Sequence, residues 1–325
     1  MAARFIAVSL LVAALAAGSA CKTRPTGTPL PITLPMTLGG RTISSENLRH
    51  GGEVYTHYCR PCHGTDGSGS GASAPGLRPP PRDLRRGIYK FGSVPAGQLP
   101  TDDDFVRIIK GGLHGTAMLA WDVPAAELDD LIQYTKAFSP RWLTEKAGEP
   151  IAVTPDPWAA APDGALVRGK LVYHGLAQCA VACHPAYATK GEIYTATKEL
   201  THIELRAFRD DLYAPVAKDS DFGFRILPPD FTFTPLRAGE TLPDIYRSVA
   251  AGIGGTAMPT WKNVLPESDL WALAHYVASL AALRGVNEAG DQLHEQLINQ
   301  PPWSPPSLDG GADGSDGAGN DVGPR

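Results

Sequence analysis

The sequence contains few cysteines, few methionines and little net charge. Its 325 residues include five cysteines and four methionines, and the formal net charge is −5. The small net charge gives no reason to expect nucleic acid as a partner. Four of the cysteines form two close pairs, which indicates a metal, a redox dithiol or a haem rather than an ordinary disulfide framework. Proline (30) and glycine (35) are frequent, which favours compact, loop-rich domains joined by linkers over long sheets or coiled coils.

The N-terminus has the features of an export signal. Arg4 precedes an apolar run at 5–17 and small residues at 18–20, so residues 1–20 are predicted to be a signal peptide, too short for a confident membrane span. Cys21, which follows directly, resembles the lipidated cysteine of bacterial lipoproteins, although Gly18 stands where those proteins usually have an aliphatic residue. Ordinary cleavage, which leaves Cys21 a free thiol, is the alternative. We expect a periplasmic protein, tethered to a membrane if Cys21 is lipidated.

One segment of the sequence occurs twice. Residues 105–123 and 245–263 align without a gap at an offset of 140 and share Arg, Gly, Gly, Thr, Ala, Met and Trp at equivalent positions. Each copy follows a close cysteine pair and precedes a segment with apolar residues at helical spacing. The sequence therefore predicts an all-α fold with two tandem helical domains, at 45–142 and 164–283.

The other segments are predicted to connect or extend these domains. We expect an extended Pro- and Thr-rich spacer at 21–44, a Pro- and Ala-rich linker at 143–163, a short polar helix at 284–300 and a disordered tail at 301–325.

The first cysteine pair lies in CRPCH, residues 59–63, which is a c-type haem attachment signal. At this spacing two thiols form thioethers with the two vinyl groups of one porphyrin, and the next residue, His63, lies under the iron as proximal ligand. A redox dithiol would require a βαβ context, which is missing, and a zinc site would require four nearby ligands. We therefore expect Cys59 and Cys62 to bind haem covalently.

The two methionines in the repeat are candidates for the sixth iron ligand. Met118 and Met258 occupy the same position of the two copies, whereas Met1 and Met36 lie in the signal and the spacer. A thioether ligand raises the reduction potential of a haem iron. Core packing is the alternative, but it does not explain why the flanking Gly-Thr-Ala and the tryptophans Trp121 and Trp261 are repeated too.

These motifs resemble those of bacterial dihaem c-type cytochromes with two class I-like cytochrome c domains. The resemblance covers residues 45–283 and rests on CRPCHG, GTAMLAW, CAVACH and GTAMPTW. It implies two haem c groups, bound covalently at Cys59, Cys62, Cys179 and Cys183, with His63, Met118, His184 and Met258 as iron ligands. It also implies electron transfer between redox partner proteins.

The second cysteine pair, in CAVACH, departs from the usual motif because three residues separate Cys179 from Cys183. One interpretation is a one-residue expansion in which a small bulge lets both thiols bond to haem, since positions i and i+4 of a helical turn face the same side. In another, the ordinary register starts at Ala180 and only Cys183 is bonded. A Cys179–Cys183 disulfide without haem is a third, which the retained Met258 argues against.

Two further features allow alternatives. His114, opposite Gly254 in the repeat, is either a competing iron ligand or a surface-loop residue. A basic cluster is either a solvated face or a site for a haem propionate and a redox partner; it contains Arg78, Arg82, Arg85, Arg86 and Lys90.

The favoured function is electron transfer, within a respiratory or dehydrogenase chain, by a protein that is not itself a catalyst. The alternative is a catalytic dihaem enzyme, a peroxidase or sulfur-compound dehydrogenase, with one open haem in the second domain. That domain has 73 residues between His184 and Met258, against 54 between His63 and Met118. A haem-based gas sensor would normally need an output module, and none is visible.

Overall fold

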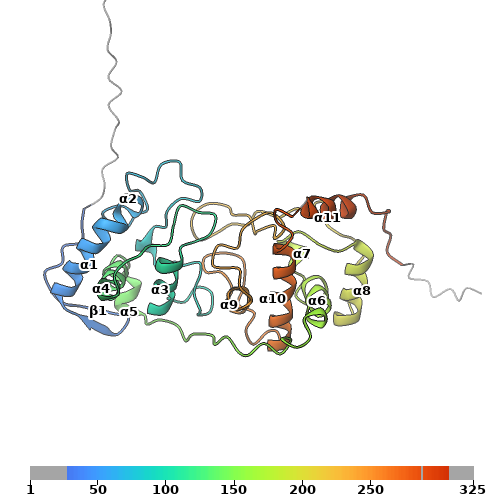
Figure 1. The fold of residues 1–325 in the computed structure, drawn as a ribbon, viewed down its shortest axis with the longest axis horizontal. Coiled ribbons are helices and arrows are strands. Elements are labelled where there is room, and N and C mark those ends of the chain that lie inside the picture. Colours follow the sequence, from blue (N-terminus) through green and yellow to red (C-terminus); the bar gives the residue numbers. More distant parts are fainter. Residues whose placement is uncertain (1–27, 287, 307–325) are drawn as a thin grey trace, which may run out of the picture.

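The computed structural model describes residues 28–286 and 288–306, which form an elongated, mostly helical molecule (Figure 1). The molecule has an N-terminal half (28–147) and a C-terminal half (151–306), which follow one another end to end along the long axis. Each half has its own hydrophobic core. The predicted signal peptide and Cys21 lie outside the described residues. Within the described ranges, no helix is both long and apolar enough to cross a bilayer.

The described N-terminal half contains a short hairpin, five α-helices and one short 3₁₀-helix. Its elements are β1 (Met36–Leu38), β2 (Arg41–Ile43), α1 (Ser45–Tyr58), α2 (Arg60–His63), the short helix η1 (Leu84–Arg86), α3 (Asp102–Gly111), α4 (Ala125–Ala137) and α5 (Arg141–Thr144).

The C-terminal half repeats the helical order of the first and adds to it. Its elements are α6 (Pro162–Leu171), the π-helical turn η2 (Val172–Leu176), α7 (Cys179–Ala182), α8 (Lys190–Thr201), α9 (Leu242–Ala251), α10 (Glu267–Ala281) and α11 (Ala289–Ile298). By their place relative to the repeated motifs, α1, α2, α3 and α4 correspond to α6, α7, α9 and α10, whereas α8 and α11 have no counterpart.

The corresponding helix pairs cross at a glycine. A Cβ on Gly51 of α1 would lie 2.0 Å from the Asp130 carbonyl oxygen of α4, and a Cβ on Gly169 of α6 would lie 2.1 Å from the Ala272 carbonyl oxygen of α10. No side chain fits in either place. The close crossings hold α1 against α4 and α6 against α10, and α1 and α6 each lead towards a cysteine pair.

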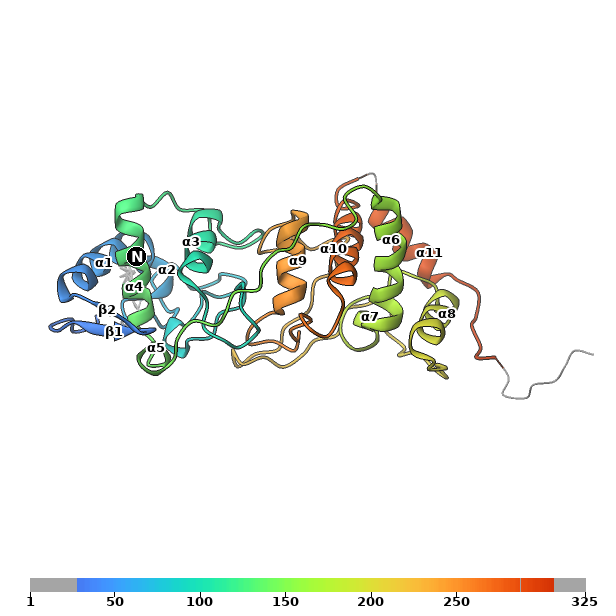
Figure 2. The ribbon, with the colours of Figure 1, turned by 90° about the horizontal axis from the view of Figure 1, so that it is seen from below.

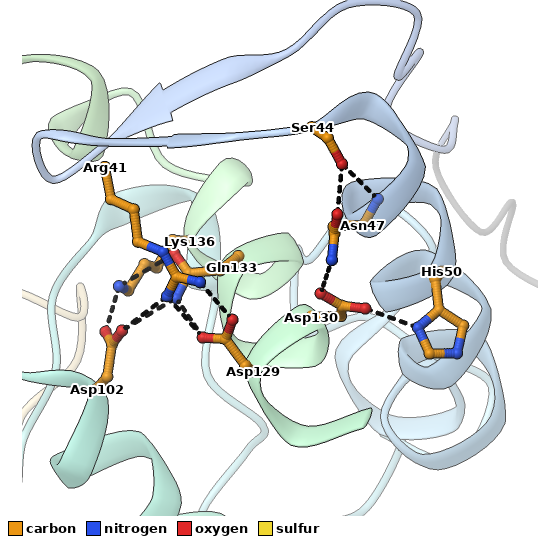
Figure 3. Close-up of polar contacts among 9 residues, drawn as sticks. All are labelled: Arg41, Ser44, Asn47, His50, Asp102, Asp129, Asp130, Gln133 and Lys136. Atoms are coloured by element: carbon orange, nitrogen blue, oxygen red, sulfur yellow. Dashed lines mark hydrogen bonds and ion pairs between the residues drawn. The ribbon is translucent and has the colours of Figure 1, made fainter. Parts of the chain in front are cut away.

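Polar contacts also hold the strands and helices of the N-terminal half together (Figure 3). The Arg41 guanidinium of β2 donates to both oxygens of the Asp129 carboxylate of α4, at 2.8 and 2.6 Å. Asn47 and His50 of α1 contact the Asp130 carboxylate at 2.8 and 2.7 Å. Exposed pairs of this kind contribute little individually, but together they orient α1 against α4.

The described part of the spacer (21–44) differs from the expectation of an extended, unpacked segment. Leu38 of β1 and Ile43 of β2 are buried in the N-terminal core, and the Gly39 amide donates to the Trp142 carbonyl at 2.7 Å. The hairpin is ordered because it packs against a residue about a hundred positions further along the chain, which local composition does not reveal.

The linker (143–163) and the start of the tail (301–325) are also packed. The Ile151 amide donates to the Ser93 carbonyl at 2.7 Å, so the linker lies against the N-terminal half, and Figure 2 shows it crossing the near face of the molecule from α5 to α6. Trp303 packs against Phe208, with 4.8 Å between ring centroids. The rest of the predicted tail, 307–325, lies outside the described residues.

The two halves meet through reciprocal hydrogen bonds. The His114 amide donates to the Arg237 carbonyl at 3.0 Å, and the Gly254 amide, at the equivalent position of the repeat, donates to the Lys90 carbonyl at 3.0 Å. A Cβ on Gly254 would lie 2.0 Å from the Tyr89 carbonyl oxygen, which explains why the second copy has glycine where the first has histidine.

Candidate haem sites

The first site is built where α1 runs into α2. The His63 amide donates to the Cys59 carbonyl at 2.9 Å, which closes one helical turn around the cysteine pair. The His63 Nδ1 lies 3.1 Å from the Arg82 carbonyl oxygen, so Nδ1–H donates to it and Nε2 is left for a metal. Burial lowers the pKa of His63, which keeps the imidazole neutral and able to ligate.

The thiols of the first pair are free to form thioethers. Cys59 and Cys62 are half-buried and not disulfide-bonded, and burial raises the pKa of Cys59 to about 12. In the ranges that the structure covers, no three His, Cys, Asp or Glu side chains are grouped to hold a metal ion, so neither pair has the further ligands of a zinc site.

The second site has the same arrangement with one more residue in the turn. The His184 amide donates to the Cys179 carbonyl at 3.0 Å, as His63 does to Cys59, so the wider turn contains the extra residue. The His184 Nδ1 lies 3.2 Å from the Pro229 carbonyl oxygen, which again leaves Nε2 for a metal. Burial lowers the pKa of His184 to about 4 and raises that of Cys179 to about 12. Cys179 therefore occupies the structural position of Cys59.

Both predicted methionine ligands lie in turns with the same hydrogen bonds. The Leu113 amide donates to the Met118 carbonyl at 2.7 Å, the Met118 amide donates to Thr116 Oγ1 at 3.0 Å, and that hydroxyl donates to the Leu113 carbonyl at 2.8 Å. Ile253, Thr256 and Met258 form the same three bonds, at 3.2, 3.1 and 2.8 Å. None of these contacts joins a methionine to the histidine of its own half.

The other sequence candidates lie near these sites without joining them. The Trp121 ring packs edge-on against Tyr58, 5.9 Å between centroids, beside the first cysteine pair. Trp261 is held at the end of α9, where its amide donates to the Ala250 carbonyl at 3.1 Å. The His114 side chain is exposed, as expected for a surface loop.

A cluster of cations lies at the junction of the halves. The Arg82 guanidinium stacks 3.5 Å from the centroid of the Phe222 ring, and the Lys90 ammonium lies 5.4 Å from it. Burial, with the charges of Arg82 and Arg237, lowers the pKa of Lys90 to about 8, and burial lowers the pKa of Arg237. Among the described residues, no carboxylate pairs with Arg82, Lys90 or Arg237. This unbalanced positive charge suits the carboxylates of a haem.

Together, the paired thiols, the oriented imidazoles and the cation cluster fit covalently bound haem. The N-terminal half also matches a known family: residues 46–134 match the family model of cytochrome c oxidase, cbb3-type, subunit III. These residues are a cytochrome c domain. No curated protein matches the chain.

A solved structure extends the similarity beyond this cytochrome c domain. A chain of the reducing HAO-like protein complex of Kuenenia stuttgartiensis is similar with a TM-score of 0.56 and 29% sequence identity. The match covers 71% of this chain and 95% of that chain, so it includes much more than residues 46–134.

Sequence reasoning missed part of the junction. Lys90 and Arg237 are equivalent, because each lies seven residues after an aspartate, Asp83 or Asp230, and two residues before a glycine. This shared spacing could reveal from the sequence that Lys90 and Arg237 are equivalent. The equivalence is hard to see because these two residues are 147 positions apart, whereas the two copies of the methionine repeat are 140 positions apart.

Proposed function

We propose that this chain is a periplasmic dihaem cytochrome c that carries single electrons through two covalently bound haems. The observation that supports it best is the agreement between the two halves: each has a turn closed from cysteine to histidine, a histidine whose Nδ1 donates to a carbonyl, and an identical methionine turn. Cys59, Cys62, Cys179 and Cys183 bind the two haems, and His63, Met118, His184 and Met258 are the iron ligands.

Each bound haem supplies an iron that accepts one electron and returns it. The protein residues keep the ligands in place during that change. The carbonyls of Arg82 and Pro229 hold the His63 and His184 rings in one tautomer, which fixes Nε2 as the ligating atom. The Thr116 and Thr256 hydroxyls accept from the backbone amides of Met118 and Met258 and so fix the two methionine turns. If both thioether side chains ligate, neither iron would offer an open position for oxygen or peroxide chemistry.

The junction supports electron exchange between the two halves. Each methionine turn contacts the basic segment of the other half, through the Lys90 and Arg237 carbonyls. Positive charge near a haem carboxylate compensates its buried negative charge. One electron enters from a reduced redox protein, passes between the halves and leaves to an oxidised one. Lipidation of Cys21, after removal of the signal peptide, would tether the protein to a membrane.

The test is the optical spectrum of the exported protein, oxidised and reduced, with a haem-to-protein ratio. We expect two haems per chain, the absorption band of methionine-ligated ferric haem from both, and no reaction with carbon monoxide. A ratio of one would refute the second site. Two haems of which one is high-spin or binds carbon monoxide would indicate the catalytic alternative, an enzyme with one open haem in the C-terminal half.

A further inference from the structure

The backbone carbonyls of the two cysteine motifs accept hydrogen bonds from different kinds of donor. In the N-terminal half, the loop that follows CRPCH folds back beneath it: the Gly69 amide donates to the His63 carbonyl at 2.8 Å, and the Gly71 amide donates to the Cys62 carbonyl at 3.1 Å. A Cβ on Gly71 would lie 2.2 Å from the Pro61 carbonyl oxygen, so the approach requires glycine. A glycine-rich loop thus holds the first motif.

The second motif has no such loop. After His184 the chain continues to α8 and returns beneath the motif only at residues 209–216. There the Val216 amide donates to the Cys183 carbonyl at 2.8 Å. The His184 carbonyl instead accepts from the Arg209 side chain, through Nη2 at 2.9 Å, and the Ala180 carbonyl accepts from Arg209 Nε at 3.1 Å.

The Arg209 side chain also binds the segment from which it comes. Its Nη2 donates to the carbonyls of Leu212 and Ala214, at 3.2 and 2.9 Å, and its Nη1 donates to the Asp211 carboxylate at 2.7 Å. A guanidinium has five N–H donors in a fixed planar fork, which few other side chains could replace. Because it is bonded on both sides, Arg209 fixes the distance between the returning chain and the widened turn.

The extra residue of CAVACH makes this support necessary. The turn from His184 to Cys179 encloses one more residue than the turn from His63 to Cys59. Because the His184 amide donates to Cys179 and not to Ala180, four residues before it, the Ala180 carbonyl does not receive the backbone hydrogen bond that a regular helix would supply. The His184 carbonyl belongs to the predicted iron ligand itself. The guanidinium reaches both.

We propose that Arg209 is the positioning residue of the second haem site, holding the widened CAVACH turn and His184 in the geometry that two thioethers and one axial bond require. This inference rests on the proposed function, because it assumes a second haem. It assigns a purpose to part of the longer insert of the C-terminal half: the insert supplies a side chain where the N-terminal half uses a glycine-rich loop.

The experiment compares Arg209→Gln and Arg209→Lys with Arg206→Gln in the exported full chain. Arg206 is a matched control because it lies in the same segment but is exposed and contacts Glu204 and the Pro306 carbonyl, away from the motif. The measurements are the haem-to-protein ratio, the number of thiols that can be alkylated after denaturation, and the reduction potential and spin state of each haem. The first haem serves as internal reference.

We expect Arg209→Gln to lose the second haem, or to keep it with one thioether, a free Cys179 or Cys183 thiol and a shifted potential, while the first haem is unchanged. Arg209→Lys should restore part of the second site, and Arg206→Gln should match the wild type. Arg209→Gln with two doubly attached haems and unchanged potentials would overturn the inference.

If Arg209→Gln cannot be recovered, Arg209→Lys decides, and wild-type attachment and potentials in that variant would equally overturn it. A lower protein yield with both haems normal in the protein that remains would indicate a purely structural role for Arg209 and would also overturn the inference. A wild-type chain with one haem would instead refute the proposed function before any variant is compared.

Discussion

Replacing Gly169 by alanine should destabilise the C-terminal half and disturb its haem site. The added Cβ would lie 2.1 Å from the Ala272 carbonyl oxygen and 2.6 Å from the Tyr276 Cβ, whereas ordinary contact begins at 3.4 Å. Because the obstacle is backbone, α6 and α10 would have to separate by about 1 Å, a form of overpacking that costs ~1–3 kcal/mol. Alanine's better helix propensity offsets up to ~1 kcal/mol of that. The overpacking cost less this offset should lower the free energy of unfolding by about 1–2 kcal/mol.

The assay is urea unfolding followed by circular dichroism and by the absorption band of methionine-ligated haem. Gly51→Ala should have a similar effect on the N-terminal half, since its Cβ would lie 2.0 Å from the Asp130 carbonyl oxygen. Gly111→Ala is the matched control, because it is also helical and its Cβ would meet nothing within 4 Å. A Gly169→Ala midpoint equal to or above that of the wild type would refute the reasoning.

Three further predictions concern the haem sites and their surroundings. Met118→Ala and Met258→Ala should each make one haem high-spin and able to bind carbon monoxide, as seen in difference spectra; a variant with both haems unchanged would contradict ligation there. Burial lowers the pKa of His174 from 6.5 to about 4, so the unfolded chain binds the additional proton and the C-terminal half should lose about 3 kcal/mol of unfolding free energy as pH falls through that range. Urea midpoints at pH 7 and pH 4 measure this loss, and His174→Gln should reduce it. Lys90→Gln and Arg237→Gln should lower haem reduction potentials by on the order of tens of millivolts, since each removes a positive charge near the proposed carboxylates; potentiometric titration measures the shift, and unchanged potentials would place the carboxylates elsewhere.

The helices next to the repeated motifs were predictable from local signals. The apolar spacing that predicts a helix after each repeat copy matches the buried faces of α4 and α10, and Pro124 and Pro266 directly precede these helices. The hairpin of β1 and β2 was not predictable, because its order depends on Trp142, which lies far away in the sequence. The local spacing of apolar residues thus predicts helices that bury one regular apolar face. It does not predict short segments that are stabilised by residues far away in the sequence.

The candidate sites were predictable where a motif carries the chemistry. CRPCH and the two methionine turns are local, and the structure gives them matching hydrogen bonds. Arg209 was not predictable, because it lies in an insert without a counterpart and acts through carbonyls that any residue possesses. The cations at the junction come from segments far apart in the chain, and only the fold brings them together.

The reciprocal junction has a consequence for how the protein meets its redox partners. Two similar halves that contact each other through equivalent surfaces have the geometry of an isologous dimer, here contained within a single polypeptide. In such an arrangement the interface groups of one half are used by the other half and not by a second copy of the chain. The amides of His114 and Gly254 are already used in this way. External donors and acceptors therefore have to dock on surfaces outside this pseudo-dimer interface.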